Sequence, residues 1–269
     1  MRALTFIVRF QTAQFKLHHQ KLVRKTYLIP PPSAVAGLFG AVLGVPRREL
    51  KAFCRENGVM AGAELLSLEG FYVTLARIFK FDSERSSLGG LKKLINDYWN
   101  GSERALKDML GTRPIKESEE LFRPTYKFAV VAENKVIDEG LKRLRELYFE
   151  YEIFGGNDYH FVEDIGNVRE ANIIKSLEGT GYCPIDLVKD IHAYSQRFEV
   201  VRSIEYLAGR RELNLPFIVS APVGPDLEQF FFAYRANFVT RTEVDAVYDG
   251  ESKIFVFNAE RYLVHEGGS

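Results

Sequence analysis

The chain has 269 residues, 46% of them hydrophobic and 27% charged, which suffices for a packed core and excludes collagen-like, disulfide-rich and wholly disordered proteins. Its 36 basic and 36 acidic residues cancel, which argues against a protein that coats nucleic acid without specificity. No stretch approaches the roughly 20 apolar residues of a membrane span, and two cysteines, Cys54 and Cys183, are too few for a disulfide framework or a zinc site. We therefore expect a cytoplasmic protein with reduced thiols and with no metal, cofactor or membrane partner.

The N-terminal segment is basic and free of acidic residues. Residues 1–48 contain eight lysines and arginines and no carboxylate, so they carry a charge of +8 and the remainder of the chain carries −8. An even spread would place about six acidic residues in this segment, and such one-sided charge favours a polyanionic partner. A solvated basic surface is the alternative interpretation.

A strand, a basic loop and a helix are predicted at the start of the chain. Residues 1–10 alternate apolar and polar side chains, which is typical of a strand and not of a signal peptide. The polar and basic loop 11–28 follows. Three prolines at 30–32 predict the start of a helix, with Ser33 as its N-cap or in its first turn.

Glycines mark one face of this helix. Gly37 and Gly40 lie inside it, and Gly44 is expected to end it. Because each internal glycine costs about 1 kcal/mol relative to alanine, we expect a backbone or a ligand to lie close to this face. A second short helix is predicted at 46–57.

The middle of the chain is predicted to leave a sheet and return to it. A strand at 69–82 leads into an irregular excursion at 83–123, and a second strand is expected at 126–133. A helix at 138–154 should end at Gly155 and Gly156, with another strand after it. This βαββαβ order predicts a ferredoxin-like domain, the topology that also underlies the RNA-recognition motif.

The C-terminal part is predicted to be mostly β, with candidate strands at 199–206, 215–221, 229–238 and 253–257. The predicted fold class is therefore α+β, a ferredoxin-like, RRM-like N-terminal domain followed by a β-rich region. The expected divisions are a domain at 1–180 that contains the 83–123 insertion, a β-rich region at 181–264 and a tail at 265–269.

The best candidate site is the basic loop, because cations neutralise phosphates and planar rings stack on bases, at about 1–3 kcal/mol per base. Its candidate RNA contacts are Lys16, His18, His19, Lys21, Arg24, Lys25 and Tyr27. The helix start at Ser33 could receive a phosphate, and the Gly155-Gly156 turn could form an anion nest or simply cap a helix. The insertion adds Arg113 and Arg123, although its acidic residues make it equally typical of a solvated loop.

Three motifs resemble one known family. The run 27–44, from Tyr27 through Pro-Pro-Pro-Ser to the helix that ends Gly-Ala-Val-Leu-Gly, resembles the signature of the fifth CRISPR-associated (Cas) protein family. These proteins are RAMP-superfamily subunits of type I Cascade. The stretch 113–126 resembles the arm that returns to the third strand of the family, and 155–158 resembles its glycine-rich turn. The resemblance covers residues 1 to about 165.

This resemblance implies a non-catalytic, RNA-binding role. Members hold the 5′ handle of the CRISPR RNA (crRNA), cap the row of Cascade backbone subunits and contact the large subunit near the PAM-binding end; target DNA is met through the assembled complex. A protruding thumb, here 83–123, pins a kinked nucleotide.

A nuclease is the rival interpretation. One branch of the family, in type I-C systems, cleaves repeat RNA without metal by means of Tyr, Lys and His. Tyr27 lies near the expected place, but Lys116 is followed by Glu117 and not by the histidine of that pattern. A metal-independent endoribonuclease would instead use His18 or His19 as a general acid or base. A third possibility is an assembly subunit whose basic face meets an acidic protein.

Overall fold

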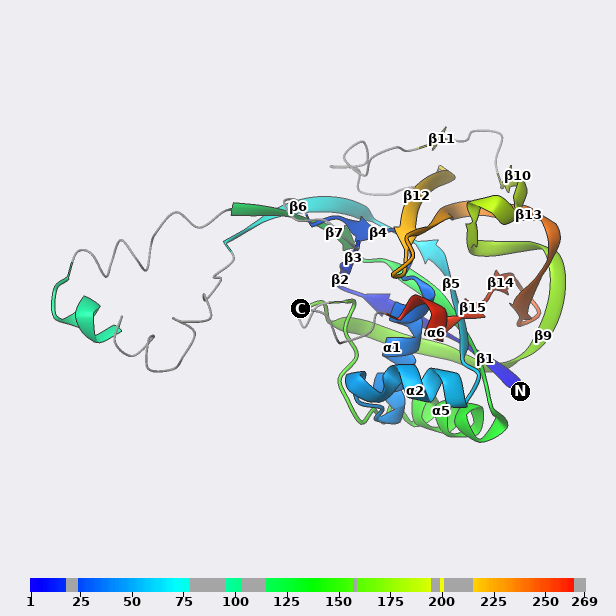
Figure 1. Cartoon of the computed structure of the whole chain (residues 1–269), viewed down its shortest axis with the longest axis horizontal. Coiled ribbons are helices and arrows are strands. Elements are labelled where there is room, and N and C mark those ends of the chain that lie inside the picture. Colours follow the sequence, from blue (N-terminus) through cyan, green and yellow to red (C-terminus); the bar gives the residue numbers. More distant parts are fainter. Residues whose placement is uncertain are drawn as a thin grey trace.

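The structure, a computed structural model, describes residues 1–17, 24–77, 95–102, 115–156, 159–194, 199–200 and 215–263. The chain has a mixed α+β fold, and beyond residue 184 the described residues are almost entirely strands, as the sequence predicts. Figure 1 shows the main helices gathered on one side of the molecule and the C-terminal strands on the other. These helices are α1 (Pro32–Leu43), α2 (Leu50–Glu56) and α5 (Asn134–Glu146).

The N-terminal sheet is antiparallel and has β1 (Arg2–Phe10) at its centre. Its strands are β9 (Val162–Pro184), β1, β8 (Thr125–Ala132) and β5 (Met60–Ser67), in that spatial order. Leu4 and Phe6 are fully buried with the helices on one face, whereas Ala3 packs with Val247 and Ile254 on the other. Because both faces are covered, β1 carries almost no exposed side chain.

The first helix begins and ends at the predicted residues. Pro31 is the N-cap of α1, Pro32 is its first residue, and Ser33 lies in its first turn. Gly44 adopts the left-handed conformation (φ 79°) and ends the helix, which glycine does without a Cβ penalty. The predicted second helix is a 3-10 turn, η1 (Arg47–Glu49), followed by α2.

The helix predicted at 138–154 is displaced and shorter. Helix α5 runs from Asn134 to Glu146 and ends where Leu147 takes a left-handed conformation. The apolar row that suggested a longer helix divides at this point, because Leu144 is buried whereas Leu147 and Tyr151 are exposed. The segment that follows turns toward α1, where the amide of Tyr151 donates to the carbonyl of Ala41.

A β-hairpin arm leaves the body of the molecule (Figure 1). It consists of β6 (Gly70–Arg77) and β7 (Ile115–Phe122), and β7 also pairs with β2 (Thr12–Ala13). The strand predicted at 69–82 is β6, but it pairs with β7 in the arm and does not belong to the N-terminal sheet. The second strand of that sheet in chain order is β5, at residues that were not predicted as a strand. Residues 78–82 lie outside the described residues. So does most of the 83–123 insertion, apart from residues 95–102 and 115–123.

The β-rich part is built on two long strands, β9 and β13 (Glu228–Tyr248), which pair with each other. The remaining elements are η2 (Ile185–Leu187), β10 (Val188–Ala193), β11 (Glu199–Val200), β12 (Phe217–Val223), β14 (Lys253–Phe255), β15 (Phe257–Asn258) and α6 (Ala259–Tyr262). Strands β12, β13 and β14 overlap the predicted strands, whereas β13 continues ten residues beyond its predicted end at 238. Only Glu199 and Val200 of the strand predicted at 199–206 are described.

A buried ion pair joins the N-terminal sheet to the turn between β13 and β14. Lys127 of β8 is almost fully buried, and its Nζ lies 2.9 Å from Asp249 Oδ2 and 3.0 Å from Glu251 Oε2. Burial of Asp249 opposes ionisation, but hydrogen bonds from Lys127 and from two backbone amides outweigh it and hold the pKa of Asp249 below its ordinary value. The pair therefore holds the β13–β14 turn against the first sheet.

Candidate functional site

Four of the predicted RNA contacts, His18, His19, Lys21 and Arg113, lie outside the described residues. The other eight fall into three places. Lys16, Tyr27, Ser33 and Gly156 line one groove, and Gly155 lies in the turn beside it. Arg24 and Lys25 lie beside β7, and Arg123 lies in the turn between β7 and β8.

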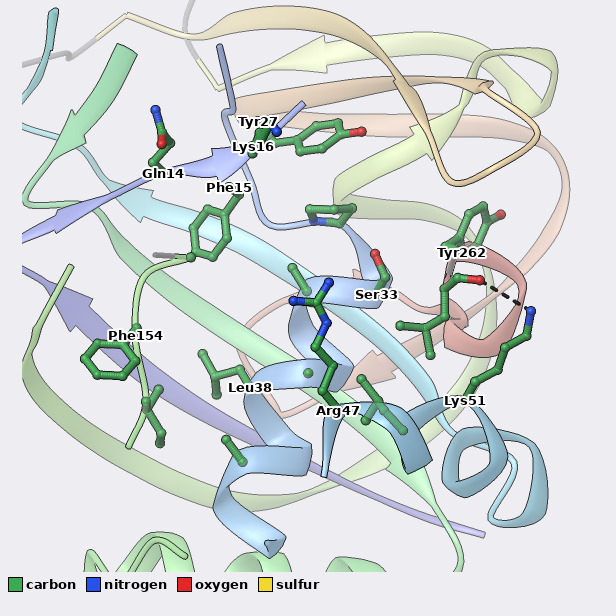
Figure 2. Close-up of a pocket in the computed structure, with 18 of the residues that line it drawn as sticks. Gln14, Phe15, Lys16, Tyr27, Ser33, Leu38, Arg47, Lys51, Phe154 and Tyr262 are labelled. Carbon is green, nitrogen blue, oxygen red and sulfur yellow. Dashed lines mark hydrogen bonds between the residues drawn. The ribbon is translucent and has the colours of Figure 1, made fainter. Parts of the chain in front are cut away.

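The α1 groove, as we call it, has a volume of about 750 Å³ and opens along the N-terminal part of α1 (Figure 2). One wall comes from β3 (Phe15–Lys16) and β4 (Thr26–Tyr27), which form a small two-stranded sheet. The opposite wall comes from η1 and α2, and residues 152–156 close one end. The groove thus brings together the basic loop, the helix start and the glycine turn that the sequence singled out separately.

Small residues of α1 form the floor of the groove. Ala34, Gly37 and Ala41 line it, and a Cβ at Gly37 would meet its nearest neighbour only at 3.8 Å. A Cβ at Gly40 would instead lie 2.8 Å from Cδ1 of Leu50. The two glycines therefore act differently: Gly40 lets α2 pack against α1, whereas Gly37 widens the groove.

Cations dominate the rim of the groove. Lys16 projects from one wall, and Arg47, Arg48 and Lys51 line the other, whereas Glu152 is the single carboxylate among the lining residues that the structure describes. Such a rim favours a polyanion.

Arg48 and Lys51 also make contacts within the chain. The guanidinium of Arg48 lies 3.2 Å from Glu49, but both side chains are mostly exposed, so this pair is weak. Nζ of Lys51 donates a long hydrogen bond of 3.4 Å to the carbonyl of Leu263, which Figure 2 shows as a dashed line.

Three of these cations were missed as individual site residues. Arg47 and Arg48 belong to the acid-free segment 1–48, and Lys51 follows it closely. The charge distribution of the sequence pointed to these cations. Their place opposite Lys16 depends on the turn of the chain from α1 into η1 and α2, which the sequence did not show. Other cations of the same segment are neutralised by distant acids, since Arg2 pairs with Asp138 and Glu170.

Tyr27 is a structural residue of the groove wall. Its side chain is 2% exposed, its ring packs on Phe232 at 5.5 Å between centroids, and its hydroxyl donates a 2.5 Å hydrogen bond to the carbonyl of Pro222. These contacts tie the N-terminal loop to β12. A hydroxyl held in this way is not placed to attack RNA.

Arg24 and Lys25 lie against the arm. The backbone of Arg24 exchanges hydrogen bonds with Glu117 and Glu119 of β7, and Nζ of Lys25 lies 3.9 Å from the buried Glu119 carboxylate. Glu119 therefore offsets part of the charge of Lys25.

The glycine turn makes its close approach to the chain's own backbone. The carbonyl of Gly155 accepts a 2.7 Å hydrogen bond from the amide of Gln14. Gly156 has φ 110°, and a Cβ there would overlap the carbonyl of Gln14. The turn thus fixes β2 and β3 in place and leaves Gly156 on the groove surface.

Arg123 is held by two carboxylates, Glu69 at 2.9 Å and Glu163 at 3.1 Å. Its charge is thereby balanced within the chain.

His160 is buried beside β2. Its Nδ1 lies 2.6 Å from Oγ1 of Thr12, and burial lowers its pKa below the ordinary value, which Glu120 partly opposes.

Among the described residues no cluster of His, Cys, Asp and Glu could hold a metal ion. Nor does any described helix have the length and apolarity needed to cross a membrane.

Comparison with known proteins gives one family. The model of the family described as CRISPR-associated protein (Cas_Cas5) matches residues 3–204. No curated protein matches the chain.

Three solved structures are similar at low identity. A CRISPR protein from Archaeoglobus fulgidus is 12% identical, with 95% of this chain and 98% of that one covered and a TM-score of 0.41. A chain of a CRISPR RNA-guided surveillance complex is 17% identical with a TM-score of 0.35, and a Cas protein is 13% identical with a TM-score of 0.33. Both of these alignments cover 60% of this chain, and they cover 60% and 63% of the other chains respectively.

Proposed function

The chain belongs to the CRISPR-associated protein family whose model matches residues 3–204, and from this premise we propose that it is an RNA-binding structural subunit of a type I Cascade surveillance complex. In this proposal it holds the 5′ handle of the crRNA and caps the row of backbone subunits beside the large, PAM-recognising subunit. Target DNA is met through the assembled complex, in the cytoplasm.

The observation that carries the proposal is the cationic rim of the α1 groove. Lys16 on one wall faces Arg47, Arg48 and Lys51 on the other, across a floor of small residues. A single strand of RNA carries one charge per nucleotide, and cations on both sides can neutralise successive phosphates as the strand passes. Glu152, the single carboxylate among the described lining residues, lies at the end closed by residues 152–156, which makes that end the less favourable one for phosphate.

The remaining predicted contacts extend this path. Ser33 lies in the first turn of α1, where the helix dipole favours an anion. Arg24 and Lys25 precede β4 and lie beside the arm, and Gly156 lines the groove next to Gln14. His18, His19, Lys21 and Arg113 keep their proposed role as RNA contacts, with the thumb formed by the insertion at 83–123. Of the proposed RNA contacts, Arg123 has the least support, because two ion pairs already balance its charge.

The proposal includes a ferredoxin-like, RRM-like N-terminal domain at 1–180. The spatial order β9-β1-β8-β5 and the antiparallel pairing support it, because in chain order these strands are the fourth, first, third and second. The β-rich region at 181–264 would then be the second part, although β9 runs through both.

The alternative is a metal-independent repeat endoribonuclease. It would need an accessible tyrosine, lysine and histidine in one place. Tyr27 is buried and donates its hydroxyl to Pro222, and His160 is buried against Thr12. Both observations favour a binder over a nuclease.

The test is to incubate the purified protein with its own repeat RNA in EDTA, and to assemble the complex in parallel. We expect the RNA to stay intact and the handle to be retained in the complex. Wild-type cleavage that disappears when His18 and His19 are both replaced with Gln would establish the nuclease instead, because glutamine keeps hydrogen bonding but does not transfer protons near neutral pH.

A further inference from the structure

The outer strand of the arm has an open backbone edge. In the three-stranded sheet β2-β7-β6, strand β6 lies at the margin, and no described strand pairs with its outer side. Figure 1 shows the arm projecting from the body of the molecule.

The hydrogen bonds of β7 show which groups of β6 point outward. Glu117 and Glu119 bond through their backbones to Arg24, on the side of β7 away from β6. In an antiparallel ladder the backbone N–H and C=O groups of successive residues point to opposite edges of the strand. Those of Ser118 and Glu120 therefore point toward β6. Their partners in the register are Thr74 and Tyr72.

The amide and carbonyl of Val73, between those two residues, therefore point outward. By the same alternation, so do those of Phe71 and Leu75. The edge thus presents donors and acceptors at the spacing of one strand.

This edge lacks the features that normally protect an edge strand. Natural edges carry charged residues, prolines or bulges that oppose pairing with another chain. The eight residues of β6, GFYVTLAR, contain no proline, and Arg77 at the end is the single charged residue. The register with β7 runs from Gly70 to Arg77 without a shift, and Val73 is 46% exposed.

The surrounding charge favours a polypeptide over RNA. Residues 70–76 carry no charge, and the adjacent strand β7 carries Lys116 and three glutamates, of which Glu119 and Glu120 are buried. A neutral edge offers no cation to a phosphate, whereas its outward backbone groups can pair with an extended polypeptide.

We propose that the outer edge of β6, centred on Val73, binds an extended strand of a neighbouring protein subunit by β-strand addition. The inference rests on the proposed function in one respect, namely that the chain works within a complex of several proteins. It adds the surface and the mode of contact, a main-chain ladder with the side chain of Val73 against the partner.

Hydrogen exchange resolved to single amides tests the proposal, on the isolated chain and on the complex assembled from the proteins and crRNA of its own CRISPR locus. In the isolated chain we expect the amides of Tyr72 and Thr74 to be protected and that of Val73 to exchange rapidly. In the complex the amide of Val73 should slow at least about tenfold, and this protection should survive digestion of exposed RNA.

Two substitutions separate pairing from folding. Val73→Lys should weaken retention of a neighbouring protein subunit while the crRNA stays bound, because a charge on an edge opposes pairing. Leu177→Lys, at a residue of β9 that is 48% exposed, is the matched control and should retain every subunit. Val73→Thr keeps the branched shape and should behave like the wild type.

Several results would overturn the proposal. An amide of Val73 that exchanges equally fast in the complex, or a Val73→Lys complex with all its subunits, shows that no strand is added. If digestion of the RNA abolishes the protection of the Val73 amide, the edge binds RNA. If this amide becomes protected in the isolated chain as the protein concentration rises, the edge binds a second copy of the chain. A wild-type chain that copurifies with no other protein of its locus refutes it too, whereas retention of those proteins without crRNA refutes only the handle-binding role.

Discussion

Removing the three cations of the second groove wall should weaken RNA binding by an amount that can be worked out in advance. The perturbation is the triple variant Arg47→Ala, Arg48→Ala and Lys51→Ala, which leaves Lys16 and the groove floor in place. If each cation neutralises one phosphate of a single strand, the log–log slope of affinity against salt becomes shallower by about 2, at about 0.7 per contact. At about 0.1 M salt the same loss corresponds to about a hundredfold in affinity.

The assay is fluorescence anisotropy with a labelled handle RNA over a series of salt concentrations. The control is the variant Lys135→Ala, Lys142→Ala and Arg145→Ala, which removes three exposed cations of α5 that do not line the groove. Because both variants change the net charge equally, a general electrostatic effect would lower both affinities alike. Melting temperatures of the two variants should match that of the wild type, since Arg47 and Arg48 are exposed. A slope unchanged in the groove variant, or changed equally in the control, would refute the reasoning.

Three further predictions concern stability. Gly156→Ala should destabilise the fold by about 2 kcal/mol or more in chemical denaturation, because its φ of 110° and the carbonyl of Gln14 leave no room for a Cβ; an unchanged midpoint would contradict this. Gly40→Val should cost about 1–3 kcal/mol by the same measurement, since even one methyl would press on a buried leucine of α2. The lowered pKa of Asp249 contributes stability that is present above its ordinary pKa of about 4 and is lost as pH falls through the folded value. Asp249→Asn should therefore destabilise the protein at pH 7, because it removes one of the two carboxylates that pair with the buried Lys127, and it should make the loss of stability at acid pH less steep. A loss of unchanged steepness would assign it to other groups.

Local signals of the sequence were sufficient for the first helix and its surroundings. Three prolines before Ser33 and glycine at position 44 determine where α1 starts and stops, because proline fixes φ and glycine tolerates the left-handed region. The alternation in residues 1–10 likewise predicted β1. These features depend on neighbouring residues alone, so no tertiary information is needed.

The boundaries set by tertiary packing were not predictable in the same way. Leu147 ends α5 in a left-handed conformation that leucine seldom adopts, because the chain turns there to bond with α1. Strand β9 exposes many of its polar residues along its first two thirds, so its 23 residues lack the apolar alternation that marks a half-buried strand. Its course is determined by pairing with β1 and then with β13.

The candidate site was predicted in composition but not in geometry. The acid-free N-terminal segment contains Lys16, Arg47 and Arg48, which the fold brings to one groove. Charge alone could not show that Arg2 would be neutralised by acids more than a hundred residues away. Nor could it show that Tyr27, aromatic and beside a basic loop, would be buried with its hydroxyl bonded to Pro222.

Cross-linking of the assembled complex to its own crRNA, mapped residue by residue with mass spectrometry, tests the central claim most directly. The account predicts that nucleotides of the 5′ handle cross-link to peptides of the α1 groove, in particular those that contain Lys16, Arg47, Arg48 and Lys51, and that the RNA recovered is uncut by this chain. Cross-links from the handle that avoid the groove and fall on another subunit, or on the α5 side of this one, would contradict it.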